Sequence, residues 1–269
     1  MPQMRARHEL IKKLDPAHVS YSVLDQAPQI EEYVGISEAL GVDVYPWHGS
    51  LSDNLTQSYA AFDFLLTSIK GREDRVGICV PQYFGWQNYD GNPAYTLPPA
   101  AAMRAMAFGG IARGCKGLLL YSYYDLFQTT SPEDAPYQNR TRASAEVIAA
   151  RLLELQLFGR EVRALEPILL QDSYNGHLKL GAHAEGVVGG LRCPPPPAAK
   201  AVSGAAEEAE EAEQAEAECT LFLVNLTPEP QRAQGRVDLS ALTAGRRDGT
   251  SFAQFLAPYG VAITGVSLA

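Results

Sequence analysis

The sequence has no excess of positive charge and no long hydrophobic run. It carries 22 Lys and Arg against 31 Asp and Glu, for a net charge of −9, so it offers no basic stripe to neutralise nucleic-acid phosphates. No stretch reaches the roughly 18 apolar residues of a membrane helix. The first 15 residues are basic but lack the apolar core of a signal peptide. We therefore expect no nucleic-acid or membrane partner, and a cytoplasmic location for the chain as written.

The acidity is confined to one segment. Seven glutamates lie between Glu207 and Glu218, and without them 24 acidic residues face 22 basic ones, a net charge of −2. Four consecutive prolines precede this segment, and its alanine-glutamate run has no basic partners four residues on. The pattern predicts a disordered or fraying insertion over residues 194–218, in a loop between strands.

Cysteine is scarce, and no C-x-x-C pair is present, which makes a zinc site unexpected. Cys79 and Cys115 lie in apolar contexts and are predicted to be plain core thiols. Cys193 and Cys219 bracket the acidic insertion and could pair across neighbouring strands in an oxidising compartment. The sequence also lacks a P-loop, a Rossmann glycine pattern and a Ser-His-Asp order. We expect neither a metal nor a cofactor.

The first part of the chain, residues 1–166, alternates between helical and strand patterns. Helices are predicted over 4–14, 54–71, 99–114 and 142–165, and strands over 18–25, 42–47, 75–86 and 115–126. Residues 30–41 read as a crossover that ends at Gly41. Strands that are apolar along their length are typical of parallel sheets covered by helices. The predicted class is therefore α/β, with about four βα units that make half of a TIM-type barrel.

The second part, residues 167–269, has a different character. Short strands are predicted over 168–173, 177–184, 186–193, 219–226, 235–242 and 260–268, with Gly, Asn and Pro between them. No further long helix is evident. This pattern predicts a small antiparallel β-sandwich, interrupted by the acidic insertion.

Four motifs in order carry a resemblance to a known family. They are the helix end "IKKLDP" before "HVSYSVLD", the strand "GVDVYPWHG", the strand end "VPQYFGW", and "MRAMAFGGIARGCKG" leading into "LLLYSYYDL". Together with the C-terminal "LAPYGVAITGVSL", they resemble the C-terminal half of a glycoside hydrolase-like (β/α)8 barrel, of β-galactosidase-like or uncharacterised relatives, followed by a β-sandwich. The resemblance covers nearly the whole chain.

The resemblance implies a protein that acts on or binds carbohydrate at the carboxyl face of the barrel strands. In such enzymes an acid/base carboxylate follows the fourth strand in an Asn-Glu pair, which would precede Met1, so we expect a truncated chain that lacks the acid/base half. The nucleophile position on the seventh strand corresponds to Gln82, and an amide cannot form the covalent intermediate. Two alternatives stay open: a non-catalytic carbohydrate-binding pseudoenzyme, and a fragment with no independent activity. Whether the chain is an enzyme is therefore undecided at this point.

The expected site residues all lie at strand ends, which meet at one face of a barrel. The catalytic candidates are Asp43 and Asp125. The substrate-binding candidates are Asp25, Tyr45, Trp47, His48, Gln82, Trp86, Tyr121 and Tyr123. For each, a structural role is the alternative: a carboxylate can cap a turn, an indole can cover the rim, and Gln82 can satisfy backbone groups.

Four βα units would leave two open sheet edges and one uncovered face. We therefore expect the isolated chain to be poorly soluble, or to associate with itself or with a missing N-terminal barrel half. The expected ligand is a carbohydrate.

Overall fold

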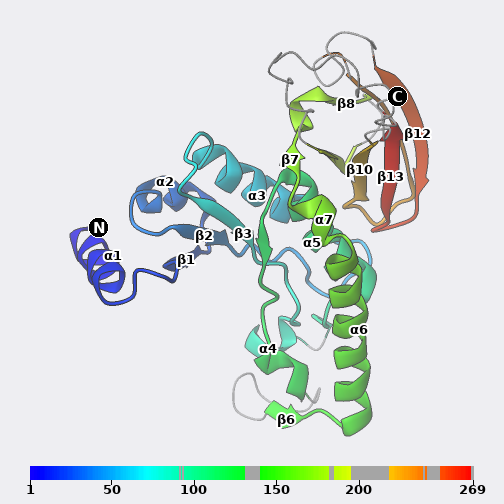
Figure 1. Cartoon of the computed structure of the whole chain (residues 1–269). Coiled ribbons are helices and arrows are strands. Elements are labelled where there is room, and N and C mark those ends of the chain that lie inside the picture. Colours follow the sequence, from blue (N-terminus) through cyan, green and yellow to red (C-terminus); the bar gives the residue numbers. More distant parts are fainter. Residues whose placement is uncertain are drawn as a thin grey trace, which may run out of the picture.

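The computed structural model describes residues 1–90, 92, 94–130, 140–181, 185–194, 218–238, 240 and 249–267. It has an α/β part followed by a two-sheet β-sandwich (Figure 1). The predicted fold class, α/β followed by a small antiparallel sandwich, is confirmed. The predicted acidic insertion lies, apart from its two ends, outside the described residues.

The α/β part is built on an open sheet of four parallel strands in the order β1-β2-β3-β4. These strands are β1 (Tyr21–Leu24), β2 (Ala39–Val42), β3 (Val76–Cys79) and β4 (Gly117–Leu118). Backbone hydrogen bonds continue the pairing of β4 with β3 as far as Tyr121. The register sets Tyr21 beside Ala39 and Ala39 beside Val76.

Helices separate the strands in sequence. They are α1 (Pro2–Leu14), η1 (Ala27–Gln29), α2 (Ile30–Tyr33), α3 (Thr56–Ser68), α4 (Gln87–Asp90), α5 (Ala100–Arg113), η2 (Tyr124–Phe127), α6 (Ala145–Ala164) and α7 (Glu166–Leu169). Two of them, α3 and α5, cover one face of the sheet. Helix α6 runs from the short hairpin of β5 (Gln128–Thr130) and β6 (Arg140–Arg142) up to the sandwich (Figure 1). Its N-cap is Ser144, whose hydroxyl accepts a hydrogen bond from the Val147 N–H.

The sandwich consists of two antiparallel sheets, in the orders β13-β10-β9-β7 and β12-β11-β8. Its elements are β7 (Asp172–Ser173), η3 (Asn175–His177), β8 (Leu178–Leu180), β9 (Val187–Cys193), β10 (Glu218–Asn225), β11 (Gln231–Val237), β12 (Thr250–Leu256) and β13 (Val261–Ser267). Apolar side chains of both sheets form one core, which includes Leu191, Leu221, Leu223 and Val237.

Helix α5 lies between the parallel sheet and the sandwich and is apolar on every side. Ten of its fourteen residues are buried, because the helix packs against the parallel sheet on one side and the sandwich on the other. Glycine and alanine permit the close approach: a Cβ at Gly110 would lie 2.7 Å from Cys79 Sγ, and one at Gly190 of β9 would overlap the Ala112 carbonyl. The buried Arg192 guanidinium donates to the Ile111 carbonyl near the C-terminal end of α5. This contact ties the sandwich to the helix.

Several element boundaries differ from the sequence-based predictions. The second strand begins at Ala39, so Gly41 lies inside the strand and does not end a crossover. A glycine is needed at this position because the Tyr21 ring lies against it and leaves no room for a Cβ. Residues 43–47 are irregular. The strand expected over 168–173 is reduced to β7 at its end, and its first two residues belong to the short helix α7. Strand β12 was missed, since its mostly exposed, mixed residues show no clear alternation.

All four cysteines form disulfides. Cys79 on β3 pairs with Cys115 after α5, with Cα atoms 6.0 Å apart, so the prediction of two plain core thiols is wrong. Cys193 and Cys219 are cross-strand neighbours on β9 and β10, with Cα atoms 4.2 Å apart. Disulfides persist mainly in oxidising compartments. The cytoplasmic location expected from the N-terminus therefore remains a prediction, and these bonds weigh against it.

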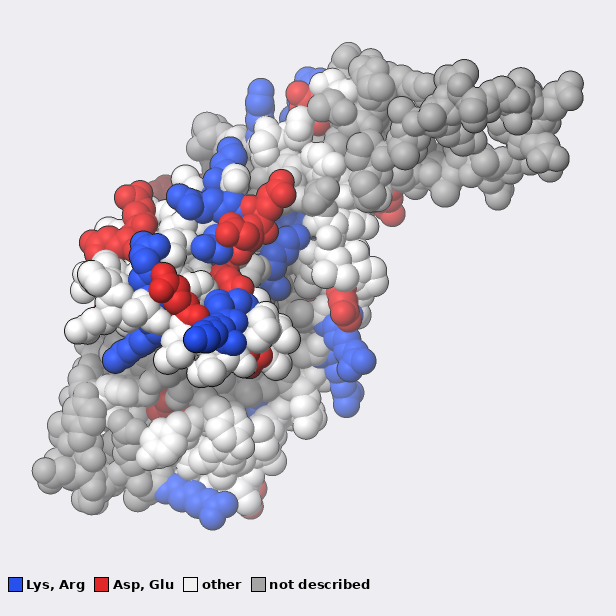
Figure 2. Space-filling view, turned by 60° about the vertical axis from the view of Figure 1, so that its left-hand side comes forward, with Lys and Arg blue, Asp and Glu red and all other residues white. Residues whose placement is uncertain are grey.

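Charges of both signs are interspersed on the surface. Figure 2 shows blue and red side chains intermingled on one part of the molecule, above an area that is largely uncharged. Within the described part of the chain, no helix has the length and apolarity needed to cross a membrane.

Two glycines in helix interiors give a matched test of the packing around α5. Ala is intrinsically the better helix former by about 1 kcal/mol. Gly159 in α6 has open space around its Cβ position, whereas a Cβ at Gly110 meets the Cys79 side chain. We predict that Gly159→Ala raises the free energy of unfolding and Gly110→Ala lowers it, measured by urea denaturation. Equal effects of the two substitutions would contradict the packing of α5 against β3.

Candidate functional site

Five aromatic rings gather where the carboxyl ends of β2, β3 and β4 meet. The buried Phe84 lies at their centre, with its ring centroid 4.9 Å from Tyr45, 5.1 Å from Trp86, 4.9 Å from Tyr89 and 5.7 Å from Tyr121. Tyr45 and Tyr121 stack nearly parallel at 5.6 Å. Tyr121 is 44% exposed and Trp86 is partly exposed. We call these five residues the aromatic cluster.

Asp43 lies at the edge of the aromatic cluster. Its Oδ2 accepts a hydrogen bond from the Tyr45 hydroxyl at 3.0 Å, while its Oδ1 is buried and has no partner among the described residues. The indole N–H of Trp86 is also buried and without a described partner. Buried polar atoms are normally hydrogen-bonded, so these two atoms are exceptions within the described part of the chain. One is an acceptor and the other a donor.

Asp25 is the neighbour of Asp43 on the adjacent strand. The Asp43 N–H donates to the Leu24 carbonyl at 3.2 Å, which continues the parallel register by one residue. Both carboxylates therefore lie on the same face of the sheet, on strands about 4.8 Å apart. Burial, and to a smaller extent the negative charge of Asp25, raises the pKa of Asp43, against the effect of the Tyr45 hydrogen bond. Asp25 itself is exposed.

Gln82 is fully buried and fully engaged with the backbone. Its Oε1 accepts from the Trp47 N–H at 2.9 Å, and its Nε2 donates to the carbonyls of Trp47 and Phe84 at 2.9 and 3.0 Å. The side chain therefore connects the end of β3 to the segment after β2. This is the structural role that was the alternative for Gln82, and it leaves no exposed surface for a ligand.

Trp47 and His48 point to different environments. Trp47 is 2% exposed, donates its indole N–H to the Thr96 carbonyl at 3.0 Å, and packs edge-on against Tyr259 of the sandwich. It therefore belongs to the interface between the two parts of the chain. His48 donates from Nδ1 to the Pro46 carbonyl and stacks parallel to Trp86 at 6.0 Å. It covers one face of that indole.

Asp125 is buried beneath the aromatic cluster. It is 1% exposed, and its carboxylate accepts hydrogen bonds from Asn88 at 2.7 Å, from Tyr89 at 2.9 Å and from Ser122. Asp125 therefore holds the Tyr89 side chain in position. The strand pairing ends at Tyr121, so side chains beyond it no longer alternate between the two faces of the sheet. Tyr123 packs on Phe127 at 5.0 Å, outside the cluster.

The structure thus brings five of the expected site residues together: Asp25, Asp43, Tyr45, Trp86 and Tyr121. His48 stacks on the Trp86 ring of this group. Sequence reasoning missed Phe84 and Tyr89, although both lie in the aromatic-rich stretch after β3 that drew attention to Gln82 and Trp86. Burial raises the pKa of Tyr89 and Tyr45, which keeps both hydroxyls protonated as donors. Over the described residues, no three His, Cys, Asp or Glu side chains are placed to hold a metal ion.

No family model matches this sequence, and no curated protein matches it at a significant level. The resemblance to glycoside hydrolases therefore remains a prediction, as do the carbohydrate ligand and any activity.

The buried amide of Gln82 allows a direct test of its role. In Gln82→Glu, a carboxylate would face the two carbonyls to which the amide donates, an arrangement that costs about 2–4 kcal/mol. Burial and these carbonyls would raise the pKa of the new carboxyl, so the loss of stability should be larger at pH 8 than at pH 5. Urea denaturation at both pH values measures this.

The exposed Gln254→Glu is the matched control for this substitution, and we expect it to change stability little at either pH. If Gln82→Glu were as stable as Gln254→Glu at pH 8, the buried hydrogen-bonding role of Gln82 would be wrong.

Proposed function

We propose that the chain binds carbohydrate through the aromatic cluster and Asp43. The observation that carries this proposal is the aromatic surface at the strand ends: Tyr121 is 44% exposed and Trp86 is partly exposed, beside the half-buried carboxylate of Asp43. A sugar hydroxyl can donate a hydrogen bond to a carboxylate such as that of Asp43. The apolar face of a pyranose ring suits an aromatic surface such as that of Tyr121.

The surroundings support a neutral, hydroxyl-rich ligand. Tyr45 and Tyr89 donate their hydroxyl protons to Asp43 and Asp125, which holds both rings in place as contact surfaces. The cluster lies at the carboxyl ends of the strands, where the Tyr121 ring is accessible to a ligand. Binding needs neither Gln82 nor Trp47, which are occupied by structural contacts.

Binding can be tested with a panel of neutral oligosaccharides and isothermal titration calorimetry. We predict saturable binding of at least one member, weakened about two- to twelvefold by Tyr121→Ala and by Trp86→Ala, since an aromatic contact is worth about 0.5–1.5 kcal/mol. Tyr123→Ala, an exposed tyrosine two residues away and outside the cluster, should leave the affinity unchanged. If no sugar binds, or if Tyr123→Ala weakens binding as much as Tyr121→Ala, the proposal fails.

Hydrolysis is a second candidate, favoured by the position of Asp43 beside Asp25. A half-buried carboxyl with a raised pKa next to an exposed carboxylate resembles the arrangement that acid catalysis of glycoside cleavage uses. In this scheme, Asp43 gives its proton to the leaving oxygen and Asp25 attacks the anomeric carbon; water then releases the sugar while Asp43 recovers a proton. Asp125 is too buried to take either part.

Turnover of chromogenic glycosides tests this second candidate. If it is right, Asp43→Asn and Asp25→Asn abolish turnover but leave sugar binding measurable, and the activity of the unmodified chain falls as the pH rises through the raised pKa of Asp43. Binding without any turnover would leave the chain as a binder only. Turnover that survives both substitutions would assign the chemistry to other residues.

A further inference from the structure

Both edges of the parallel sheet are open and unprotected. Within the described part of the chain, no strand pairs with the outer edge of β1 or of β4. The peptide N–H groups of Leu119 and Tyr121 donate to the carbonyls of Cys79 and Pro81 on the β3 side. The peptide groups of Leu118 and Leu120 therefore face the open edge. Neither residues 19–24 nor residues 117–121 contain a charge or a proline. Natural edge strands usually carry such features against unwanted pairing.

One face of the same sheet is uncovered. The register puts Tyr21 and Val23 of β1 on the face that Leu119 and Tyr121 occupy beyond β4. These four apolar or aromatic side chains are between 37% and 46% exposed. The opposite face is covered by α3 and α5. The exposed side chains thus lie at the two edges, where a joining sheet would meet them.

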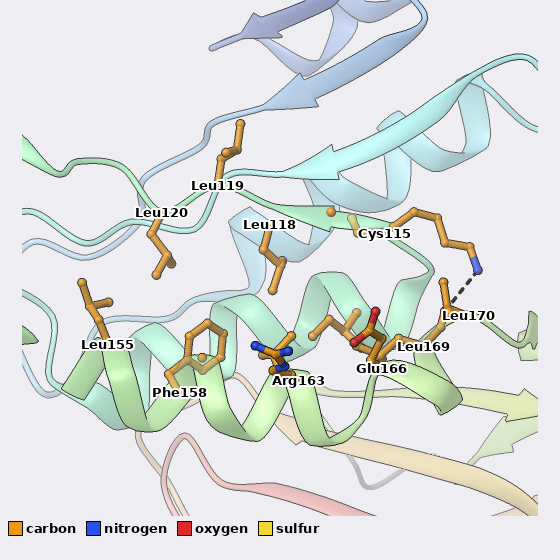
Figure 3. Close-up of a pocket in the computed structure, with 15 residues that line it drawn as sticks. Cys115, Leu118, Leu119, Leu120, Leu155, Phe158, Arg163, Glu166, Leu169 and Leu170 are labelled. Atoms are coloured by element: carbon orange, nitrogen blue, oxygen red, sulfur yellow. Dashed lines mark hydrogen bonds between the residues drawn. The ribbon is translucent and has the colours of Figure 1, made fainter. Parts of the chain in front are cut away.

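Beside the open edge of β4 lies an apolar groove of about 830 Å³. Figure 3 shows Leu118 and Leu120 pointing into it, toward Leu155 and Phe158 of α6, while Leu119 points to the other side. Its far end is closed by Leu169, and the Lys116 ammonium donates to the Leu169 carbonyl there at 3.3 Å. We call this the α6 groove. It is continuous with the open edge of β4.

At the other edge of the sheet, helix α1 presents an apolar surface. None of its residues is buried, and Leu10, Ile11 and Leu14 are 54%, 46% and 74% exposed. The helix is held beside β1 by polar contacts, among them His8 to Ser20 at 2.8 Å and Lys12 to Glu38 at 2.9 Å. One edge of the sheet therefore carries an exposed apolar helix, and the other edge carries an apolar groove.

We propose that a second copy of this chain covers these surfaces, with β4 of each copy paired in parallel to β1 of the other. A two-fold axis along the strands uses both edges of both copies and leaves none open, so the assembly closes as a dimer. Eight parallel strands are the number that forms a filled barrel. Pairing at β4 brings α1 of the partner to the α6 groove, because α1 directly precedes β1 in the chain.

The pairing also removes exposed apolar surface from water. Tyr21 and Val23 of one copy would meet Leu119 of the other on the inner face. Leu10, Ile11 and Leu14 of one copy would enter the α6 groove of the other. All strand carboxyl ends of a parallel barrel lie at one rim. The two aromatic clusters would therefore share that rim.

Light scattering coupled to gel filtration, over a dilution series, tests the proposal. We expect twice the chain mass, with the dissociation constant raised at least tenfold by Val23→Lys, Leu119→Lys or Leu10→Lys. Phe255→Lys is the control, since Phe255 is 67% exposed on β12 of the sandwich. Circular dichroism checks that each variant is folded. If the strand variants are unfolded, Leu10→Lys still tests the proposal, because no residue of α1 is buried within the single chain.

Cross-linking tests the pairing of the edges. Since all four native cysteines are in disulfides, an introduced cysteine is the single free thiol. Tyr21→Cys protein mixed with Leu119→Cys protein should give a cross-linked heterodimer with a short bifunctional maleimide, whereas Phe255→Cys mixed with Leu119→Cys should not. A monomer at all concentrations, a larger open assembly, or a dimer weakened no more by the edge variants than by Phe255→Lys would overturn the proposal.

Discussion

The packing of α5 between two sheets is the contact on which the rest of the structure depends. The helix fills the space between the parallel sheet and the sandwich, with Phe108 stacked at 6.5 Å on Phe222 of β10 and Gly110 against Cys79. A helix that is apolar all round is stable only when it is buried on all sides. The sandwich therefore completes the core around α5. Arg192 and Asn175 reinforce this by binding the carbonyls at the end of α5.

This one-sided packing also explains where the candidate site lies. Because α3, α5 and the sandwich all cover the same face of the sheet, the other face stays open. The aromatic cluster is anchored from below by Phe84 and by the hydrogen bonds of Asp125, so Tyr121 and Trp86 can remain exposed without collapsing onto the core. The position of Asp43 beside these rings follows from the register of β1 and β2.

Gln82 shows how a residue can be singled out for the wrong reason. The resemblance placed it at a nucleophile position, and its aromatic neighbours made it look like part of a sugar site. In the fold its amide holds the segment after β2 against the end of β3, through three backbone hydrogen bonds. An amide suits this task because it donates and accepts at once, which a carboxylate cannot do.

The sequence by itself determined the α/β part, the sandwich and the long helices, because apolar periodicity and glycine or proline boundaries are local signals. It also placed Asp25, Asp43, Trp86 and Tyr121 at strand ends. Tertiary structure decided which strand ends are open and which are buried: Trp47 faces the sandwich, Asp125 lies under Tyr89, and Cys79 reaches Cys115. Those outcomes depend on contacts between segments far apart in the chain, and no local pattern encodes which side of a strand a second domain will cover.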